Sequence, residues 1–201
     1  MKPSIQIYNT LSRKKEPFVP RKEGEVSIYV CGVTPYDDAH LGHARPAVVF
    51  DAFRRFLRHI GYRVTFVQNF TDVDDKIIRR AENEGVDPLA LSAKYSRRYL
   101  DSMDRLGVER ADNYPKVSEH IDAIIALIQR LIDNGAAYAS GGDVFFRVEA
   151  FAEYGKLSRQ KKEELVSGAR IEPGEGKESP LDFALWKAAK PGEPAWNSPW
   201  G

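Results

Sequence analysis

The chain has 201 residues, which suits one domain or one domain with a sizeable insertion. Its 30 Lys and Arg residues against 29 Asp and Glu residues leave a formal net charge of +1, so total charge does not indicate nucleic-acid binding, and any such contact would need a local patch. The single cysteine excludes an internal disulfide, and the sequence has neither a signal peptide nor a run of about 20 apolar residues, so we expect a cytoplasmic protein with no membrane partner.

The first informative stretch combines a strand, a turn and the start of a helix. Val26–Val30 alternates and is rich in β-branched residues, which predicts a short buried strand. Apolar residues then recur at helical spacing with arginines between them, namely Ala47, Phe50, Phe53, Leu57 and Ile60 with Arg54, Arg55 and Arg58. Between strand and helix stands His40-Leu41-Gly42-His43. A helix start favours anions, Gly42 permits close approach of a ligand, and each imidazole can donate to a phosphate oxygen.

A second strand completes a βαβ unit. Gly61 is predicted to end the helix, and Tyr62–Asn69 is rich in β-branched and aromatic residues. The two strands should be parallel, with a right-handed crossover. Ligands in such sheets lie beyond the carboxyl ends of the strands, which here carry Cys31-Gly32 and Asn69–Asp72.

Three further helices follow in the predicted order. Lys76–Asn83 is helical, and Asp75 is expected to cap it. Asp87 and Pro88 open the next helix, which Gly107 ends, with a buried stripe of Leu91, Tyr95, Tyr99, Met103 and Leu106. Another helix starts near Ser118 and stops at Asn134-Gly135, with Ile121, Ile124, Ile125, Ile128, Leu131 and Ile132 at helical spacing. We expect these stripes to be core without a functional role.

The pattern changes in the last third of the chain. Ala137–Val148 predicts a hairpin with a glycine-containing turn, and Phe183–Lys187 predicts a short strand. Between them, Arg170–Ser179 is rich in charge, glycine and proline and is expected to be a mobile loop. Trp186 and Trp200 are expected to pack in a core.

Several segments resemble one family in order and spacing. They are Tyr8–Phe18, Tyr29–Gly32, His40–His43, Thr71–Ala81, Tyr154–Ser158, Pro180–Lys187 and Ser198–Gly201. Together they resemble the cysteinyl-tRNA synthetases, which are class I aminoacyl-tRNA synthetases, over the whole chain. The resemblance implies an α/β fold with a Rossmann-type parallel sheet. Its first half would occupy residues 1–114, and an inserted small α+β connective-peptide region, with the start of the return to the catalytic domain, would occupy 115–201.

The resemblance also implies a reaction. A cysteine–tRNA ligase activates L-cysteine with ATP and Mg²⁺ to cysteinyl-adenylate, releases pyrophosphate, and passes the cysteine to tRNA(Cys). His40 and His43 would stabilise charge at the phosphates, and no protein nucleophile is required. The implied ATP-binding residues are Thr34, Asp38, His40, Gly42, His43 and Lys76. The implied cysteine-binding residues are Cys31, Gly32, Thr71 and Asp74, of which Asp74 would meet the substrate ammonium.

Cys31 carries two interpretations. By composition alone a lone cysteine at the end of a buried strand is a small core residue. By resemblance Cys31 is a zinc ligand, and direct binding of Zn²⁺ to the substrate sulfur would separate cysteine from its near isostere serine. Because the chain has one cysteine, the other zinc ligands would lie beyond Gly201, as would the Lys-Met-Ser-Lys-Ser loop and the anticodon-binding region of the family. We therefore expect an N-terminal fragment with little or no aminoacylation activity alone.

Two alternatives stay open at this point. The cysteine ligase of mycothiol biosynthesis resembles the same family and makes an amide with an amino sugar. Thr34-Pro35-Tyr36 is slightly more similar to that enzyme, whereas Tyr8–Phe18 and Lys76–Ala81 favour the tRNA enzyme. The other alternative is a truncated, non-catalytic protein that binds nucleotide. The sequence indicates no oligomeric state.

Overall fold

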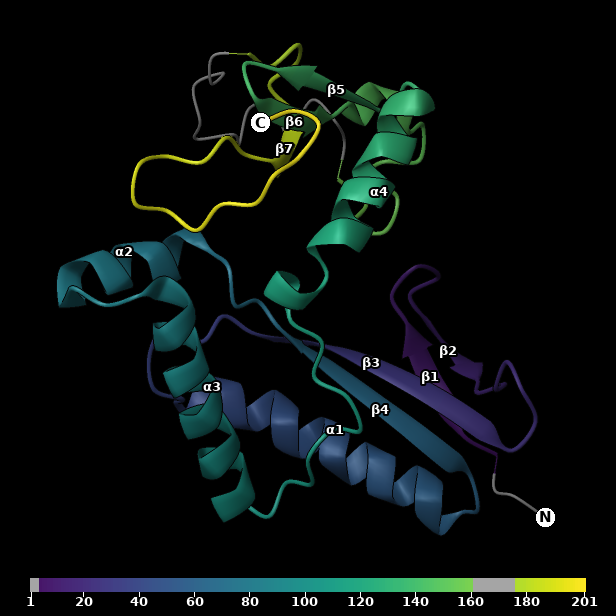
Figure 1. Ribbon diagram of the computed structural model, residues 1–201. Helices are drawn as coiled ribbons and strands as arrows, with labels where there is room; N and C mark the ends of the chain where they lie inside the picture. The colour runs from purple at the N-terminus through teal and green to yellow at the C-terminus, as the bar shows by residue number, and fades with distance from the viewer. Residues whose placement is uncertain (1–3, 161–175) are drawn as a thin grey trace. The chain divides into compact units, whose positions relative to one another are not determined.

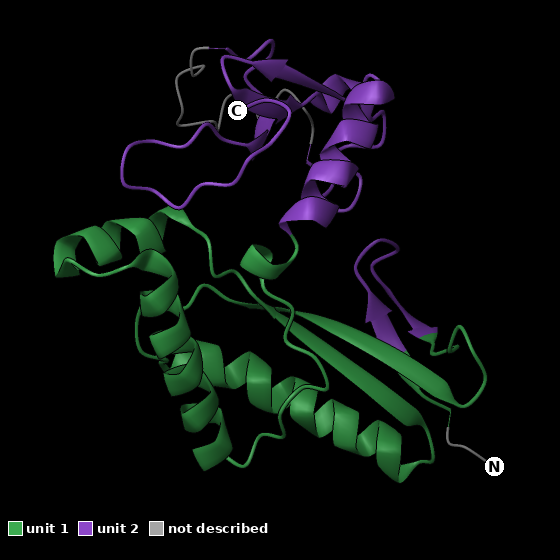
Figure 2. Cartoon of the chain, in the orientation of Figure 1, with its two compact units in different colours: residues 1–6, 17–120 green, residues 7–16, 121–201 purple. Residues whose placement is uncertain are grey.

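The computed structural model describes residues 4–160 and 176–201, and the chain forms two compact units (Figure 2). The first unit comprises Met1–Gln6 and Pro17–His120, and the second comprises Ile7–Glu16 and Ile121–Gly201. None of the described helices combines the length and the apolar content that a membrane crossing needs.

The first unit is built on the predicted βαβ motif. Strand β3 (Glu25–Val33) pairs in parallel with β4 (Arg63–Phe70), and helix α1 (Leu41–His59) connects them along one face of the sheet (Figure 1). The register runs from Glu25 opposite Arg63 to Val30 opposite Gln68. The βαβ prediction is confirmed, but β3 continues three residues past its predicted end at Val30 because a register shift lets Val33 pair with Phe70.

A third segment extends this sheet beside β4. The carbonyl oxygens of Asn113 and Pro115 accept hydrogen bonds from the N–H groups of Gln68 and Phe70, at 3.1 and 2.9 Å. The bridges between these segments are parallel. This segment could not be predicted, since it is short and its partners lie more than 40 residues earlier in the chain.

The core between α1 and the sheet follows the apolar spacing, with one exception. Val26, Leu57 and Val64 are buried, and Phe53 packs against them. The exception is Arg54, whose side chain is only 1 % exposed although the sequence placed it among the polar residues between the apolar positions. Each donor of a guanidinium buried in this way costs free energy unless it finds an acceptor within the protein.

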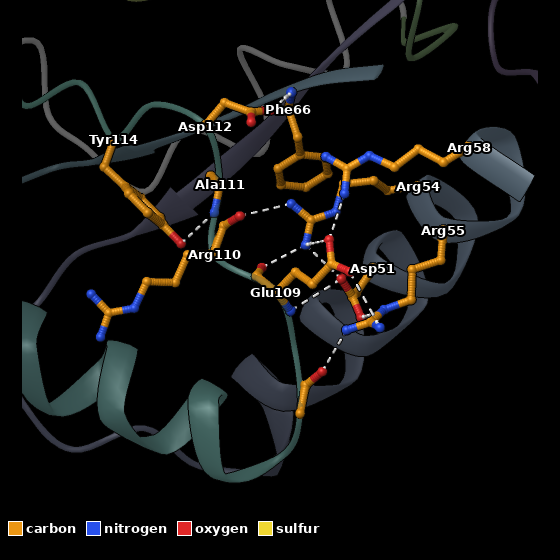
Figure 3. A network of polar contacts seen from close by, with 11 residues as sticks. Asp51, Arg54, Arg55, Arg58, Phe66, Glu109, Arg110, Ala111, Asp112 and Tyr114 are labelled. Carbon is orange, nitrogen blue, oxygen red and sulfur yellow. Dashed lines mark hydrogen bonds and ion pairs between the residues drawn. The ribbon is translucent and has the colours of Figure 1, made fainter. Parts of the chain in front are cut away.

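Arg54 Nη1 and Nη2 find their acceptors in a network that ties α1 to Glu109 and Arg110 (Figure 3), whereas the buried Nε has no hydrogen-bond partner among the described residues. Its Nη1 donates to the carbonyl of Arg110 at 2.8 Å, and its Nη2 donates to the carbonyl of Glu109 and to Asp51 Oδ1, both at 2.6 Å. Arg55 Nε donates to the second oxygen of Asp51 at 2.7 Å. Burial disfavours the charge of Asp51, but the hydrogen bonds from both arginines outweigh it and hold the pKa of this carboxyl below its usual value.

Helices α2 (Asp75–Glu84) and α3 (Pro88–Arg105) complete the first unit. The Asp87 side chain caps α3 as predicted, but the cap of α2 is Asp74 rather than Asp75, because Asp74 Oδ1 accepts the N–H of Lys76 at 2.8 Å. The predicted stripe of α3 is buried except for Leu106, which is 54 % exposed, since it lies past the last helical turn.

The second unit is mixed α and β. Helix α4 (Ile121–Asp133) precedes the antiparallel sheet β5 (Ala137–Ser140), β6 (Asp143–Phe146) and β7 (Phe183–Trp186), which confirms the hairpin and the last strand. Along α4 only Ile128 is fully buried; it packs in a core with Val144, Trp186 and Trp200.

Three smaller features differ from the predictions or fall outside them. Ser118 lies in a 3₁₀ turn (Val117–Glu119) of the first unit, so α4 begins three residues later than expected. A separate two-stranded ribbon, β1 (Gln6–Asn9) and β2 (Lys14–Pro17), precedes the βαβ unit and was not predicted. The loop predicted for Arg170–Ser179 lies mostly outside the described residues.

Candidate functional site: a histidine cap and a bulged strand end

Two histidines begin helix α1 and cap each other. The Nδ1 atom of His40 accepts the backbone N–H of Gly42 at 3.0 Å, and the Nδ1 atom of His43 accepts the backbone N–H of His40 at 3.2 Å. The ring centres are 4.1 Å apart. Since both Nδ1 atoms act as acceptors, each neutral ring carries its proton on Nε2. The cap therefore leaves two Nε2–H donors for a ligand.

Gly42 allows the His40 ring to lie this close to the backbone. A Cβ atom at Gly42 would come within 2.7 Å of the His40 ring. The pKa of His43 is lowered, chiefly because the ring is partly buried and also because of the neighbouring charge of His40. His43 is therefore biased to the neutral form, which keeps its Nδ1 available as an acceptor in the cap.

A pocket of about 100 Å³ opens beside the histidine cap. Four of the predicted site residues lie together around it. They are Thr34, Asp38, His40 and His43, and the pocket is also lined by Val33, Pro35, Tyr36, Asp37, Ala39, Tyr95 and Tyr99. His40 and His43, at the start of α1, thus line a concave space, and the start of a helix favours an anionic group.

Two ion pairs hold the loop that forms one wall of this pocket. Asp38 pairs with Arg98 of α3 at 2.7 Å, and Asp37 pairs with Arg80 of α2 at 3.3 Å. These pairs are partly exposed, so each contributes little stability alone. Their effect is to fix the loop between β3 and α1 on two helices.

Cys31 lies outside the core. Its side chain is exposed, with its Sγ 3.9 Å from the carbonyl oxygen of Gly32. The interpretation of Cys31 as a small core residue is therefore wrong, because the alternation of β3 buries Val30 and turns Cys31 to the open face.

The end of β3 is joined to the end of β4 by the side chain of Asn69. Its Oδ1 accepts from the backbone N–H of Gly32 at 2.8 Å and from the hydroxyl of Tyr29 at 2.9 Å. Its Nδ2 donates to Thr71 Oγ1 at 3.3 Å, and Thr71 N–H donates to the carbonyl of Val33 at 3.0 Å. Gly32 and Thr71, both predicted site residues, are thereby linked at the strand ends.

The remaining predicted residues lie at the start of α2. Asp74 uses its carboxylate to cap this helix, and Lys76 is exposed with its Nζ 5.4 Å from the centre of the Tyr36 ring. Neither residue lines the pocket beside the histidines. Their roles toward substrate stay predictions.

A zinc site is not completed by this part of the chain. Among residues 4–160 and 176–201, no group of three His, Cys, Asp or Glu residues is placed to hold a metal ion. A protein zinc site needs three or four such ligands. Cys31 is therefore at most one donor, and the described residues do not fit a zinc ion by themselves.

Tyr29, Asn69, Tyr95 and Tyr99 also contribute to this site, although they were not among the predicted site residues. Tyr95 and Tyr99 line the pocket, but their helical spacing is also that of core residues, so periodicity carried no signal for them. Burial raises the pKa of Tyr99, whose hydroxyl is 3.4 Å from Gln68 Nε2. Tyr29 and Asn69 were also missed as contacts; the strand-end position of Asn69 was the only available hint.

Comparison with known proteins finds relatives whose sequences align with nearly the whole chain. A cysteine–tRNA ligase of Desulforudis audaxviator is 59 % identical over 197 residues, which are 98 % of this chain and 41 % of the relative. A cysteine–tRNA ligase of Pyrococcus horikoshii is 58 % identical over 198 residues, 98 % of this chain and 42 % of the relative. The chain thus spans about two fifths of the length of the relatives it matches.

Solved structures agree on the fold class. Methionyl-tRNA synthetase of Mycobacterium tuberculosis, in complex with methionyl-adenylate, matches with a TM-score of 0.51 and 26 % identity over 56 % of this chain and 23 % of that structure. The model of the tRNA synthetases class I (C) catalytic domain matches residues 17–201. The parallel βαβ unit, its histidine-capped helix and this match over most of the sequence lead to one conclusion: the chain belongs to the class I (C) tRNA synthetase catalytic-domain family.

Proposed function

We propose that this chain supplies the first part of the catalytic site of a cysteine–tRNA ligase, in which ATP binds at the histidine cap. The observation that carries the proposal is the pair of Nδ1 acceptors in the cap, which leaves the Nε2–H groups of His40 and His43 to donate to phosphate oxygens. Thr34 and Asp38 line the same pocket and would orient the nucleotide with Gly42 and Lys76.

The proposed reaction is the activation of L-cysteine. A carboxylate oxygen of L-cysteine attacks the α-phosphorus of ATP, an O–P bond forms, and the bond to pyrophosphate breaks. The transition state gathers negative charge on the phosphate oxygens, so donors already aimed at that position lower the barrier without acting as nucleophiles. Mg²⁺ would enter with ATP and neutralise its phosphates. The cysteinyl group then passes to the terminal ribose hydroxyl of tRNA(Cys).

We propose that L-cysteine lies near the strand ends, against Gly32, Thr71 and Cys31, with Asp74 toward its ammonium. The support is the exposure of Cys31 and the linkage of Gly32 to Thr71 through Asn69. No step of this proposal passes through zinc, since the described residues do not build its site. A cytoplasmic location fits the single unpaired thiol.

A chimera tests the proposal directly. This chain would replace the matching two fifths of the Desulforudis audaxviator relative, and cysteine-dependent exchange of pyrophosphate into ATP would be measured, followed by charging of tRNA(Cys). We expect both activities, and we expect them to be lost in a His40→Asn, His43→Gln double variant of the chimera. A folded chimera without exchange activity, beside an active parent relative, would contradict the proposal.

The choice of acceptor separates the cysteine-ligase alternatives. The same chimera would be offered tRNA(Cys) or an amino sugar after adenylate formation. Transfer to tRNA alone supports the proposal, and transfer to the amino sugar supports the amide-forming ligase. ATP binding without exchange would support the non-catalytic interpretation.

A further inference from the structure

The sheet is irregular at the point where β3 reaches Cys31. Val30 is opposite Gln68 and Val33 is opposite Phe70, so three steps along β3 match two steps along β4. Cys31 and Gly32 therefore both stand against Asn69. Such a bulge removes a regular ladder hydrogen bond and leaves a backbone group in need of another partner.

The side chain of Asn69 supplies that partner. Its Oδ1 accepts the N–H of Gly32 at 2.8 Å, which replaces the missing backbone acceptor. The same oxygen accepts the Tyr29 hydroxyl at 2.9 Å, although the Tyr29 side chain is otherwise well exposed. An amide is suited to this position because it accepts on one atom and donates on the other.

The backbone also approaches too closely for any other residue at position 32. An ideal Cβ on Gly32 would lie 1.5 Å from the carbonyl oxygen of Asn69. The peptide that follows Cys31 is thus held against Asn69 by its main chain and by its side chain. Strand alternation and the bulge keep the Cys31 side chain exposed on this edge.

The other end of the Asn69 amide reaches the next predicted site residue. Its Nδ2 donates to Thr71 Oγ1 at 3.3 Å, and Thr71 N–H donates back to Val33 at 3.0 Å. Asn69 is therefore bonded to the residue after the thiol and to the threonine hydroxyl at once.

We propose that Asn69 is the positioning residue of the cysteine-binding corner: it fixes the bulged Cys31–Gly32 peptide and the Thr71 hydroxyl relative to each other, so that both face one bound L-cysteine. This role rests on the proposed function for its ligand. Asn69 acts through Gly32 and Thr71, and the histidine cap that would hold ATP makes no hydrogen bond to it among the described residues.

The first measurement tests the geometry by amide hydrogen exchange of the 201-residue chain. In Asn69→Ala, Gly32 N–H loses its acceptor, and we expect its exchange to become at least about tenfold faster. Asn69→Asp keeps an oxygen in the same place and should restore slow exchange. Asn113→Ala is the matched control, because Asn113 also borders β4 but only its backbone takes part in the sheet. Unchanged exchange at Gly32 in Asn69→Ala would overturn the proposal.

The second measurement tests the role in the chimera with the Desulforudis audaxviator relative, by the affinities of the same variants for L-cysteine and for ATP. Asn69→Ala should weaken L-cysteine binding about tenfold or more and leave ATP binding within about twofold, a split that general destabilisation would not produce. Asn113→Ala should change neither. Equal losses for both ligands, no loss for either, or a wild-type chimera that binds ATP but not L-cysteine would each overturn the proposal. Binding of neither ligand by the wild-type chimera would instead contradict the proposed function, and this role with it.

Discussion

The guanidinium carbon of Arg54 lies 4.8 Å from the centre of the Phe66 ring, so a buried cation of α1 packs on an aromatic residue of β4 (Figure 3). The same side chain donates to the carbonyls of Glu109 and Arg110. Asp112 Oδ2 in turn accepts the N–H of Phe66 at 2.6 Å. The helix that begins at the two histidines is therefore anchored to the sheet by charged and polar groups as well as by its apolar face.

Replacing Arg54 by methionine should be costly. Arg54→Met keeps a long apolar stem but removes the three hydrogen bonds to Asp51 and to the carbonyls of Glu109 and Arg110. These acceptors stay buried or partly buried without their donor. We expect a loss of about 3 to 5 kcal/mol in the free energy of unfolding, measured by urea denaturation. Arg58→Met is the control: Arg58 is partly exposed and pairs with Glu109 at the surface, so its loss should stay below about 1 kcal/mol. Similar losses for the two variants would contradict the assignment of Arg54 as the anchor.

The stability of the first unit should depend on pH through His43. Its pKa is lowered in the folded chain by burial and by His40, from an ordinary value of 6.5. The unfolded chain therefore binds the proton more readily, so the stabilising contribution is fully present above pH 6.5 and is lost as pH falls through the lower folded pKa. We expect the free energy of unfolding to fall more steeply between about pH 7 and about pH 5 in the wild type than in His43→Gln.

The control for the pH experiment is His59→Gln, since His59 is exposed in the last turn of α1. It should retain the slope of the wild type. A wild-type slope equal to that of His43→Gln would show that His43 does not titrate differently in the folded chain.

The two cap donors can be removed without removing the cap. Asn is a good residue at the first cap position, and Gln is a good residue three positions later, so His40→Asn and His43→Gln should keep α1 intact. Each should weaken ATP binding by about tenfold or more, because a hydrogen bond to a charged phosphate is lost. Calorimetric titration with ATP measures this, and His59→Gln should bind like the wild type. Full ATP affinity in both cap variants would remove the main support for the phosphate site.

Gly32→Ala should disturb the strand end severely. The new Cβ atom would lie 1.5 Å from the carbonyl oxygen of Asn69 and would have to displace it. A backbone atom cannot rotate away as a side chain can. We expect a loss of at least about 3 kcal/mol, measured by thermal and urea unfolding. Gly85→Ala is the comparison, since Gly85 has a φ of 65° but open space around it. Only the left-handed backbone conformation is then unfavourable, and it should lower the free energy of unfolding by about 1 kcal/mol. A Gly32→Ala chain as stable as Gly85→Ala would mean that the strands separate easily here.

The βαβ unit was predictable because its signals are local. Val26–Val30, the apolar spacing of α1 and Gly61 each depend on neighbouring residues, and their order fixes a parallel pair. The segment that adds to β4 at Asn113 and the burial of Arg54 were not predictable. Each depends on partners more than 40 residues away, and an arginine at helical spacing is usually solvated.

The candidate site shows the same division. The histidine cap involves four consecutive residues, and Thr34 and Asp38 line the pocket beside it, while their roles toward ATP stay predictions. The cap of α2 was predicted to be Asp75 and is Asp74, because both carboxylates can accept a backbone N–H and only the observed backbone angles decide between them. The role of Asn69 could not be predicted, because it depends on an irregular register between β3 and β4. The sequence of one strand does not specify its register with another.

The place of the N-terminal ribbon in the second unit affects the order in which the chain can fold during synthesis. The ribbon of Ile7–Glu16 belongs to the second compact unit, where Arg13 Nη2 lies 3.5 Å from the carbonyl of Ser158. The ribosome synthesises this ribbon early, but the rest of its compact unit follows only after residue 120. The βαβ unit can therefore fold before the rest of the second unit has been synthesised. Nascent chains halted near His120 should accordingly be cut by protease within the first twenty residues and resist it between Glu25 and Phe70.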